Sequence, residues 1–297
     1  MAVSGPQSSL GRILEVPRLD AAIQKPQEPA VHMADSTTAA EDGVPSKPCI
    51  ILISGAWHLP EVWNKVKTRL EAAGYEVYAP RLSTVVGAEP VNYSWRFDVA
   101  VVHDLAIPLF ARGRRAVIVG HSYGGAVTTA SLEGQTLAER QKRGLVGGFI
   151  AAVYICAFPL IHRGFSLLST LGGKYSDWQI PSQLPSTVPS SIGVVLEQAP
   201  FYSDLPPDEA EEWVAKLQFQ SKRSVEEPVE YTANDANIPM TYLLCESDKA
   251  VPIQAQETMV AAIPSMKIRR CTAGHSPFLS QPDMVVDVII EAARESR

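Results

Sequence analysis

Residues 116–125 read AVIVGHSYGG, an apolar run that ends at Gly120-His121-Ser122-Tyr123-Gly124. A Gly-x-Ser-x-Gly sequence between a buried strand and a helix places its serine on a tight, strained turn with the hydroxyl exposed. Glycines two residues before and after the serine remove side chains that would block such a turn. Apolar residues precede this motif and a helical pattern follows it, so the stretch indicates a reactive Ser122. The alternative is a serine in an ordinary strand–helix turn.

Outward from this motif, short apolar runs alternate with longer amphipathic stretches from Pro48 onward. This alternation is typical of parallel strands joined by helices. The predicted strands are Cys49–Ser54, Glu76–Ala79, Ala116–Gly120, Phe149–Ala157, Met240–Cys245 and Lys267–Cys271. The predicted helices are Pro60–Ala73, Phe97–Ala111, Gly124–Glu133, Ala255–Ala262 and Met284–Ala293.

Across residues 161–238 the alternation fails, prolines are frequent, and helical fragments such as Pro207–Phe219 remain. An insertion after a central strand of a parallel sheet is where a lid over an active site would lie. We therefore expect a helical lid at 161–238, between the two parts of an α/β core at 47–160 and 239–297.

The chain has 297 residues, of which 46% are hydrophobic. This is enough for one sizeable core with an inserted lid. Residues 1–46 lack periodicity and are rich in proline, which predicts a disordered arm. The arm has no basic start followed by an apolar stretch, so it is not a secretory signal. Its acidic residues argue against a mitochondrial presequence, and Met33 is a candidate for an alternative start.

The formal net charge is −6, without a long basic run. This pattern argues against a nucleic-acid partner and against anionic lipid. No apolar run approaches the ~18 residues of a membrane span. The four cysteines fit neither a zinc motif nor a disulfide framework, so buried thiols and a cytoplasmic location are expected. We expect no cofactor and no metal. For the oligomeric state, a homodimer is one alternative.

A serine hydroxyl needs a base to become a nucleophile, and the base needs an acid to orient it. Among six histidines, His275 is the best base, because it follows the last predicted strand in a short polar loop. Asp248 directly follows the strand before it and is the best acid. The carboxyl ends of parallel strands meet at one edge of a sheet, which predicts that Ser122, Asp248 and His275 converge there. Glu246, two residues nearer the strand, is the alternative acid.

The negative charge that develops on an attacked carbonyl needs two N–H donors. We expect them from Tyr123, which follows the serine, and from Ala56, in the loop after the first strand. Gly55 would let the backbone approach the substrate. Aromatic residues, among them Trp57, Phe158 and Trp178, are candidates for a substrate-binding wall. Each of them also fits ordinary core or lid packing.

With these residues placed, the chain from about Pro48 onward resembles the α/β-hydrolase fold superfamily. Within it, the chain is most similar to plant methylesterases, hydroxynitrile lyases and their microbial relatives. The segments that carry the resemblance are SGAWHLPEVWNKVKTRLEAAGYEV, VIVGHSYGG, the lid phrase PFYSDLPPDEAEEWVAKLQFQS, TYLLCESDKAVP and AGHSPFLSQP. The resemblance implies a mainly parallel sheet of about six strands with flanking helices and a helical lid. It also implies Ser122 as nucleophile, His275 as base, Asp248 as acid, and Ala56 and Tyr123 as oxyanion donors.

Two departures from the group bear on the chemistry. Its usual His-Gly in the oxyanion loop is Ser54-Gly55 here. The lyases carry a threonine in place of Gly55 and a lysine in place of Ser276, and these groups handle cyanohydrin and cyanide, so lyase chemistry is disfavoured. We expect a serine hydrolase acting on the ester or lactone of a small to medium, largely apolar molecule. The alternatives are a non-hydrolytic carbon–carbon or carbon–nitrogen cleavage on the same triad, and a ligand-binding protein with a vestigial triad.

Overall fold

The computed structural model describes residues 47–86, 92–181, 191–194 and 200–296. The apolar runs form a six-stranded parallel sheet in the order β10-β9-β5-β4-β1-β2. Its strands are β1 (Cys49–Ile53), β2 (Val77–Tyr78), β4 (Arg115–His121), β5 (Gly148–Ile155), β9 (Met240–Cys245) and β10 (Met266–Cys271). Strands β1, β5 and β9 are buried along their whole length, which explains why they read as unbroken apolar runs and not as alternating patterns.

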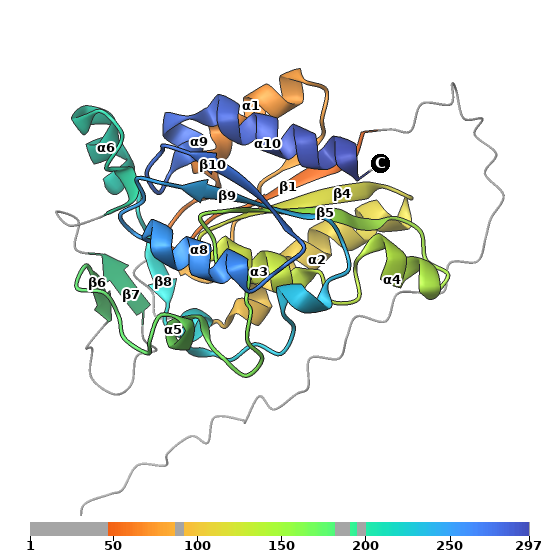
Figure 1. Ribbon diagram of the computed structural model, residues 1–297, viewed down its shortest axis with the longest axis horizontal. Coiled ribbons are helices and arrows are strands. Elements are labelled where there is room, and N and C mark those ends of the chain that lie inside the picture. The colour runs from red at the N-terminus through yellow and green to blue at the C-terminus, as the bar shows by residue number, and fades with distance from the viewer. Residues whose placement is uncertain (1–46, 87–91, 182–190, 195–199, 297) are drawn as a thin grey trace, which may run out of the picture. The chain divides into compact units, whose positions relative to one another are not determined.

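Helices cover both faces of this sheet (Figure 1). They are α1 (Asn64–Ala72), α2 (Trp95–Ala111), α3 (Gly124–Ser131), α4 (Leu137–Lys142), α8 (Ile253–Ala261), α9 (Pro277–Ser280) and α10 (Pro282–Glu295), with the 3₁₀ turn η1 (Pro60–Trp63) before α1. Figure 1 shows α1, α9 and α10 on one face and α2, α3 and α8 on the other. Helix α10 packs through its apolar stripe, which includes the fully buried Val285 and Ile289.

The strands and helices predicted from the sequence are all present, with ends that differ by one to two residues in most cases. The predicted helix at 60–73 begins as a 3₁₀ turn, and the short helix α4 was not predicted. Helix α4 begins at a capping box, in which Thr136 and Glu139 satisfy each other's backbone N–H groups.

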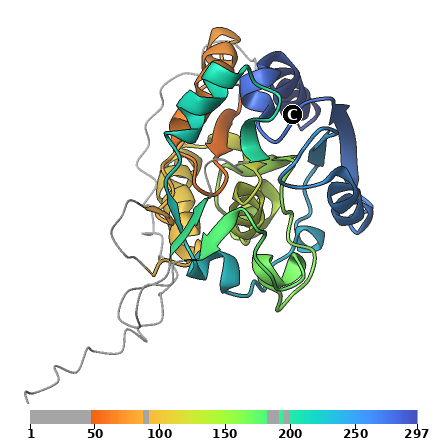
Figure 2. The same cartoon turned by 90° about the vertical axis from the view of Figure 1, so that its left-hand side faces the viewer.

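The lid, residues 161–238, is part of the same compact unit as the core, Ser46–Arg297. Its described elements are α5 (Leu167–Thr170), β6 (Gln179–Pro181), β7 (Ser191–Val194), η3 (Pro200–Tyr202), α6 (Pro207–Val214), β8 (Phe219–Ser221), α7 (Arg223–Glu226) and η4 (Ala233–Asp235). Strands β6, β7 and β8 join β3 (Val85–Val86) in an antiparallel sheet of order β3-β8-β7-β6. Figure 2 views the molecule from the side on which these elements lie.

The lid therefore contains short helices, as expected, and also a small sheet that the sequence did not predict. The helical fragment predicted at 207–219 ends at Val214. Beyond it the chain extends, because the backbone N–H of Gln218 donates to the carbonyl oxygen of Trp57 at 2.9 Å and β8 begins. These bonds to a distant loop compete with a further helical turn.

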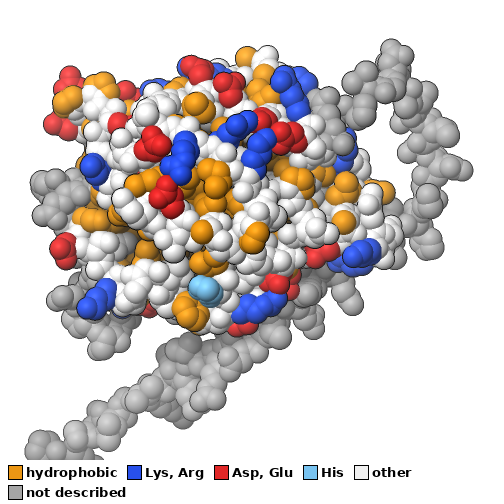
Figure 3. Space-filling view, viewed as in Figure 1, with side chains coloured by type: hydrophobic (Ala, Val, Ile, Leu, Met, Phe, Trp, Pro, Cys, Tyr) orange, Lys and Arg blue, Asp and Glu red, His pale blue; other side chains and the backbone are white. Residues whose placement is uncertain are grey.

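The predicted disordered arm at 1–46 lies outside the described residues. None of the helices in the described chain combines the length and the apolar composition that crossing a membrane needs. On the face seen in Figure 3, cationic and anionic side chains are interspersed. Ion pairs such as Lys267–Glu291 and Arg270–Glu257 contribute little individually, because both partners are partly exposed.

Candidate active site

Ser122 occupies the turn between β4 and α3, with a backbone φ of +52°. A non-glycine residue in this left-handed region is strained, as the sequence motif predicts. Gly124 permits the turn, because a β-carbon there would lie 2.6 Å from the carbonyl oxygens of Ile53 and Ser54 at the end of β1. Helix α3 therefore starts in direct contact with the central sheet, and the serine projects at its carboxyl edge.

Asp248 and His275 meet beyond the ends of the adjacent strands β9 and β10. The imidazole Nδ1–H of His275 donates to Asp248 Oδ2 at 2.8 Å, and both side chains are almost fully buried. The backbone N–H groups of Ala250 and Val251 donate to the other carboxylate oxygen at 2.7 and 2.9 Å. The carboxylate therefore accepts from several donors, and it fixes the tautomer in which His275 Nε2 carries the free lone pair.

The backbone around His275 is tied to the serine turn. His121, which precedes Ser122, donates from Nε2 to the carbonyl oxygen of His275 at 2.8 Å. The two imidazole rings lie 4.6 Å apart between centroids. Within the described residues, the Ser122 hydroxyl makes no hydrogen bond, so its contact with His275 Nε2 stays a prediction. Such catalytic hydrogen bonds are often long without substrate.

The alternative acid, Glu246, lies elsewhere. Its side chain is 43% exposed and faces Arg270 at 3.6 Å. The structure thus brings His275 together with Asp248 and leaves Glu246 at the surface.

The two expected oxyanion donors, Ala56 and Tyr123, are both buried beside the serine turn. In the part of the chain that is described, neither backbone N–H donates to a protein acceptor. A buried backbone N–H is rarely left unpaired, and such a group is a candidate for binding a substrate oxygen. Their role as an oxyanion hole stays a prediction.

Gly55 is required by close packing. A β-carbon at this position would lie 2.7 Å from His121 Nδ1 and 3.1 Å from the β-carbon of Ser122. Any side chain there would push the oxyanion loop away from the serine. Gly55 therefore keeps the oxyanion loop against the elbow.

Two of the aromatic candidates, Trp57 and Trp178, cluster with Phe201, which contacts the imidazole. Trp57 lies 5.5 Å from Trp178 and 5.6 Å from Phe201, measured between ring centroids. Phe201 in turn lies 5.6 Å from the ring of His275. Phe158 is buried, and its N–H donates to the carbonyl oxygen of Ser122 at 3.1 Å. Phe158 thus contacts the elbow, and the cluster of Trp57, Trp178 and Phe201 is the candidate wall of a substrate site.

Of the described residues, His121, Cys156 and His275 are close enough to be considered as metal ligands, with ligand atoms within 4.8 Å of one another. Hydrogen bonds already account for this closeness. His121 Nε2 and the Cys156 thiol both donate to the same carbonyl oxygen, that of His275. Burial also raises the pKa of Cys156 to about 12, which disfavours the thiolate that a metal binds.

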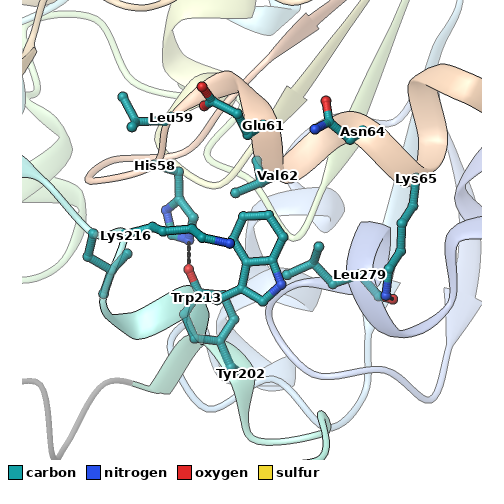
Figure 4. A pocket seen from close by; sticks show the side chains of 11 residues that line it. His58, Leu59, Glu61, Val62, Asn64, Lys65, Tyr202, Trp213, Lys216 and Leu279 are labelled. Atoms are coloured by element: carbon teal, nitrogen blue, oxygen red, sulfur yellow. Dashed lines mark hydrogen bonds between the residues drawn. The ribbon is translucent and has the colours of Figure 1, made fainter. Parts of the chain in front are cut away.

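A cavity of about 470 Å³ lies on the outer side of the oxyanion loop, between η1, α6 and α9 (Figure 4). Its inner wall is the pair His58–Tyr202, joined by a 2.9 Å hydrogen bond from the tyrosine hydroxyl to His58 Nε2. His58 Nδ1–H donates to the carbonyl oxygen of Ala56 at 2.6 Å. Burial lowers the pKa of His58 to about 4, so this imidazole is neutral at physiological pH. None of the predicted catalytic residues lines this cavity.

Several residues near the site were not found from the sequence. Asp98 in α2 is fully buried and accepts a 2.7 Å hydrogen bond from the Tyr123 hydroxyl. Asp204 in the lid accepts from the backbone N–H of Gly274 at 2.7 Å, next to His275. Both bonds join residues far apart in the chain, so no local pattern marks them. An aspartate on the apolar face of a helix was the one available signal for Asp98.

Known proteins resemble this chain over most of its length. Residues 50–288 match the Alpha/beta hydrolase family. An alpha/beta hydrolase from Aspergillus novofumigatus is 29% identical over 251 residues, which cover 84% of this chain and 98% of the relative. Polyneuridine aldehyde esterase from Rauvolfia serpentina is 23% identical over 254 residues, covering 80% of this chain and 90% of the esterase.

Solved structures of similar proteins share the fold. A polyneuridine aldehyde esterase structure superposes with a TM-score of 0.65 at 18% identity, covering 82% of this chain and 98% of the other. A pyrethroid hydrolase from Sphingobium faniae gives a TM-score of 0.63 at 20% identity, covering 83% and 97%. At this level of identity the likeness shows the fold alone.

Proposed function

The chain belongs to the Alpha/beta hydrolase family, and we propose that it is a serine esterase or lactonase with Ser122, His275 and Asp248 as its catalytic residues. The observation that carries the proposal is the 2.8 Å hydrogen bond between His275 and the buried Asp248, placed beside a strained serine turn. This is the arrangement that converts a serine hydroxyl into a nucleophile.

In the proposed reaction, Ser122 Oγ attacks the carbonyl carbon of the substrate while His275 Nε2 takes the hydroxyl proton. The N–H groups of Ala56 and Tyr123 bind the carbonyl oxygen as it becomes negative. The tetrahedral intermediate collapses, and the alcohol leaves with the proton from His275. Water then attacks the acyl-enzyme, again losing its proton to His275, and the acid is released with Ser122 regenerated. Asp248 stabilises the imidazolium at both steps.

We propose a small to medium, largely apolar substrate. The support comes from the clustered uncharged rings of Trp57, Trp178 and Phe201, of which Phe201 contacts the imidazole. Similar proteins include a polyneuridine aldehyde esterase and a pyrethroid hydrolase, so ester hydrolysis is consistent with the activities that these names give. Fold and triad alone do not determine a substrate.

A fluorophosphonate probe tests the nucleophile directly. The wild-type protein should gain one phosphonyl adduct on Ser122, seen by intact-mass and peptide mass spectrometry, and the Ser122→Ala protein should gain none. A folded wild-type protein that stays unlabelled would contradict the proposal.

Turnover of a graded panel of p-nitrophenyl esters, lactones and a cyanohydrin then tests the reaction. We expect multiple turnovers of esters or lactones, and a loss of kcat on the order of 10⁶ in Ser122→Ala, as found for the loss of a serine nucleophile elsewhere. Cleavage of the cyanohydrin without ester turnover would favour a lyase. Ligand-induced thermal stabilisation without any turnover would favour a binding protein.

A further inference from the structure

Besides the bond from Tyr202 to His58, the described lid residues make three hydrogen bonds to the oxyanion loop, all of them to Trp57. Its backbone N–H donates to Gln220 Oε1 at 3.3 Å, and its carbonyl oxygen accepts from the N–H of Gln218 at 2.9 Å. Its indole Nε1–H donates to the carbonyl oxygen of Ile192 at 2.8 Å. Trp57 has a backbone φ of +66°, a strained conformation that persists only when its surroundings impose it. These three bonds supply that constraint directly beside Ala56.

Gln220 contributes the only lid side chain to these three contacts, and its amide is fully buried in β8. Its Nε2 donates to Thr84 Oγ1 at 2.8 Å and to Ser224 Oγ at 2.7 Å. The Ser224 hydroxyl donates its hydrogen bond to the carbonyl oxygen of Ser221 at 2.6 Å. Its oxygen is therefore the acceptor in the bond with Gln220. Both hydrogens of Gln220 Nε2 are therefore donated to these hydroxyls, and Gln220 Oε1 is oriented to accept from the N–H of Trp57.

The direction of these bonds is set by Asp98. The Thr84 hydroxyl donates to Asp98 Oδ2 at 2.6 Å, so it too accepts from Gln220. The same carboxylate oxygen accepts from the Tyr123 hydroxyl at 2.7 Å, and the Thr84 N–H donates to Oδ1 at 3.0 Å. Asp98 is fully buried, and burial raises its pKa to about 6, which leaves it a carboxylate at neutral pH.

One continuous buried chain of hydrogen bonds therefore links the two expected oxyanion donors. It runs from the Tyr123 side chain through Asp98, Thr84 and Gln220 to the N–H of Trp57, next to Ala56. We propose that Gln220, a lid residue, is a positioning residue of the oxyanion hole, which it holds in register with the serine turn through Thr84 and Asp98. The inference rests on the proposed hydrolase function and adds a determinant outside the triad and the oxyanion loop.

The chain offers a matched pair of variants. Gln220→Met keeps the length of the side chain and removes every hydrogen bond of the amide. Gln218→Met makes the same change two residues earlier, where the amide bonds, among the described residues, only the carbonyl oxygens of Lys216 and Leu217. The Gln218 contact to Trp57 uses the backbone and is kept in that variant.

We expect Gln220→Met to lower kcat for a p-nitrophenyl ester by about 10- to 100-fold with little change in KM, since a small displacement of a catalytic group costs this much. The rate of fluorophosphonate labelling should fall by the same factor, because phosphonylation also places an anionic oxygen in the oxyanion hole. Gln218→Met should match the wild type in both. A merely structural role would lower the melting temperature and leave both rates of the folded protein unchanged.

Thr84 gives a second pair, in case Gln220→Met does not fold. Thr84→Val keeps the shape and breaks the chain, and Thr84→Ser keeps the hydroxyl. We expect Thr84→Val to lose kcat and labelling rate and Thr84→Ser to retain them. A folded Gln220→Met or Thr84→Val protein with wild-type kcat and labelling rate would overturn the inference while leaving the hydrolase proposal intact. A wild-type protein that the probe does not label would overturn both.

Discussion

The two sides of the serine turn are held in place by different parts of the molecule. On one side, Asp248 and His275 follow β9 and β10, neighbouring parallel strands in which Cys245 pairs with Cys271. On the other side, the loop of Ala56 and Trp57 follows β1, and the lid fixes it. The acid–base pair is thus a product of the core sheet, whereas the geometry of the oxyanion side depends on an insertion.

The lid also contacts the histidine side, but differently. Asp204 binds the backbone N–H of Gly274 and the hydroxyl of Ser280, and it does not touch the acid–base pair itself. The lid thus makes one hydrogen bond next to His275 and a ring contact from Phe201 to its imidazole, whereas it makes three hydrogen bonds to Trp57, which adjoins an expected oxyanion donor. We infer that changes in the lid should act first on stabilisation of the oxyanion, and changes at the ends of β9 and β10 on proton transfer.

The largest effect should come from the acid. Asp248→Asn removes the acceptor that fixes the His275 tautomer, and we expect kcat to fall by about 10⁴-fold, as in other serine hydrolases. Steady-state kinetics with a p-nitrophenyl ester measures this fall in kcat. Glu246→Gln is the control and should leave kcat unchanged, because Glu246 is exposed and bound to Arg270. A larger loss in Glu246→Gln than in Asp248→Asn would reverse the assignment of the acid.

The free energy of unfolding should fall at acid pH because of His58, which lies in the oxyanion loop. The pKa of its imidazole is about 4 when folded and near 6.5 when unfolded. Between these pH values the unfolded chain binds a proton that the folded protein excludes, so stability falls as the pH falls. Over this interval the loss is about 3 kcal/mol.

Urea unfolding of the wild type and of His58→Gln between pH 7 and pH 4 measures this contribution. The variant should be less stable at pH 7 and should lose less stability as the pH is lowered. Comparing the two proteins cancels the opposite contribution of Asp98, whose folded-state pKa is raised. Parallel pH curves for both proteins would contradict the assignment.

Removal of one hydroxyl should separate stability from catalysis. Tyr123→Phe deletes the bond to Asp98, and we expect a loss of about 1–3 kcal/mol in the free energy of unfolding together with a several-fold lower kcat. Tyr154→Phe is the control, because its buried hydroxyl bonds Thr129 at 2.9 Å and is no part of the chain to Gln220. It should lose comparable stability and keep its kcat. Equal kcat values in the two variants would show that the bond from the Tyr123 hydroxyl to Asp98 does not position the oxyanion donors.

The smallest effect should come from the aromatic cluster. Trp178→Ala opens space beside Trp57 and Phe201, and each aromatic contact is worth only about 0.5–1.5 kcal/mol. We expect KM to rise a few-fold for esters with bulky aromatic groups and to stay constant for p-nitrophenyl acetate. Trp213→Ala, which changes the outer cavity, should alter neither value. A rise in KM for Trp213→Ala alone would place the substrate in that cavity.

Much of the core follows from the sequence because its signals are local. The buried strands read as apolar runs, and Gly120 and Gly124 mark the turn at Ser122. The order of strands with polar residues at their carboxyl ends was enough to bring Asp248 and His275 together, since parallel strands share one edge. The lid sheet was missed because its strands are short, and β3 pairs with β8 more than a hundred residues away.

The sequence by itself determined a parallel α/β core, the serine turn and the two strand ends that carry the candidate acid and His275, since each depends on patterns within a few residues of the chain. Only the tertiary structure decided how the oxyanion loop is held, which carboxylate faces the histidine, and that Asp98, Thr84 and Gln220 form one buried chain. The physical reason is that hydrogen bonds between distant side chains impose no periodicity on the sequence. Their energy depends on burial and direction, which exist only after the chain has folded.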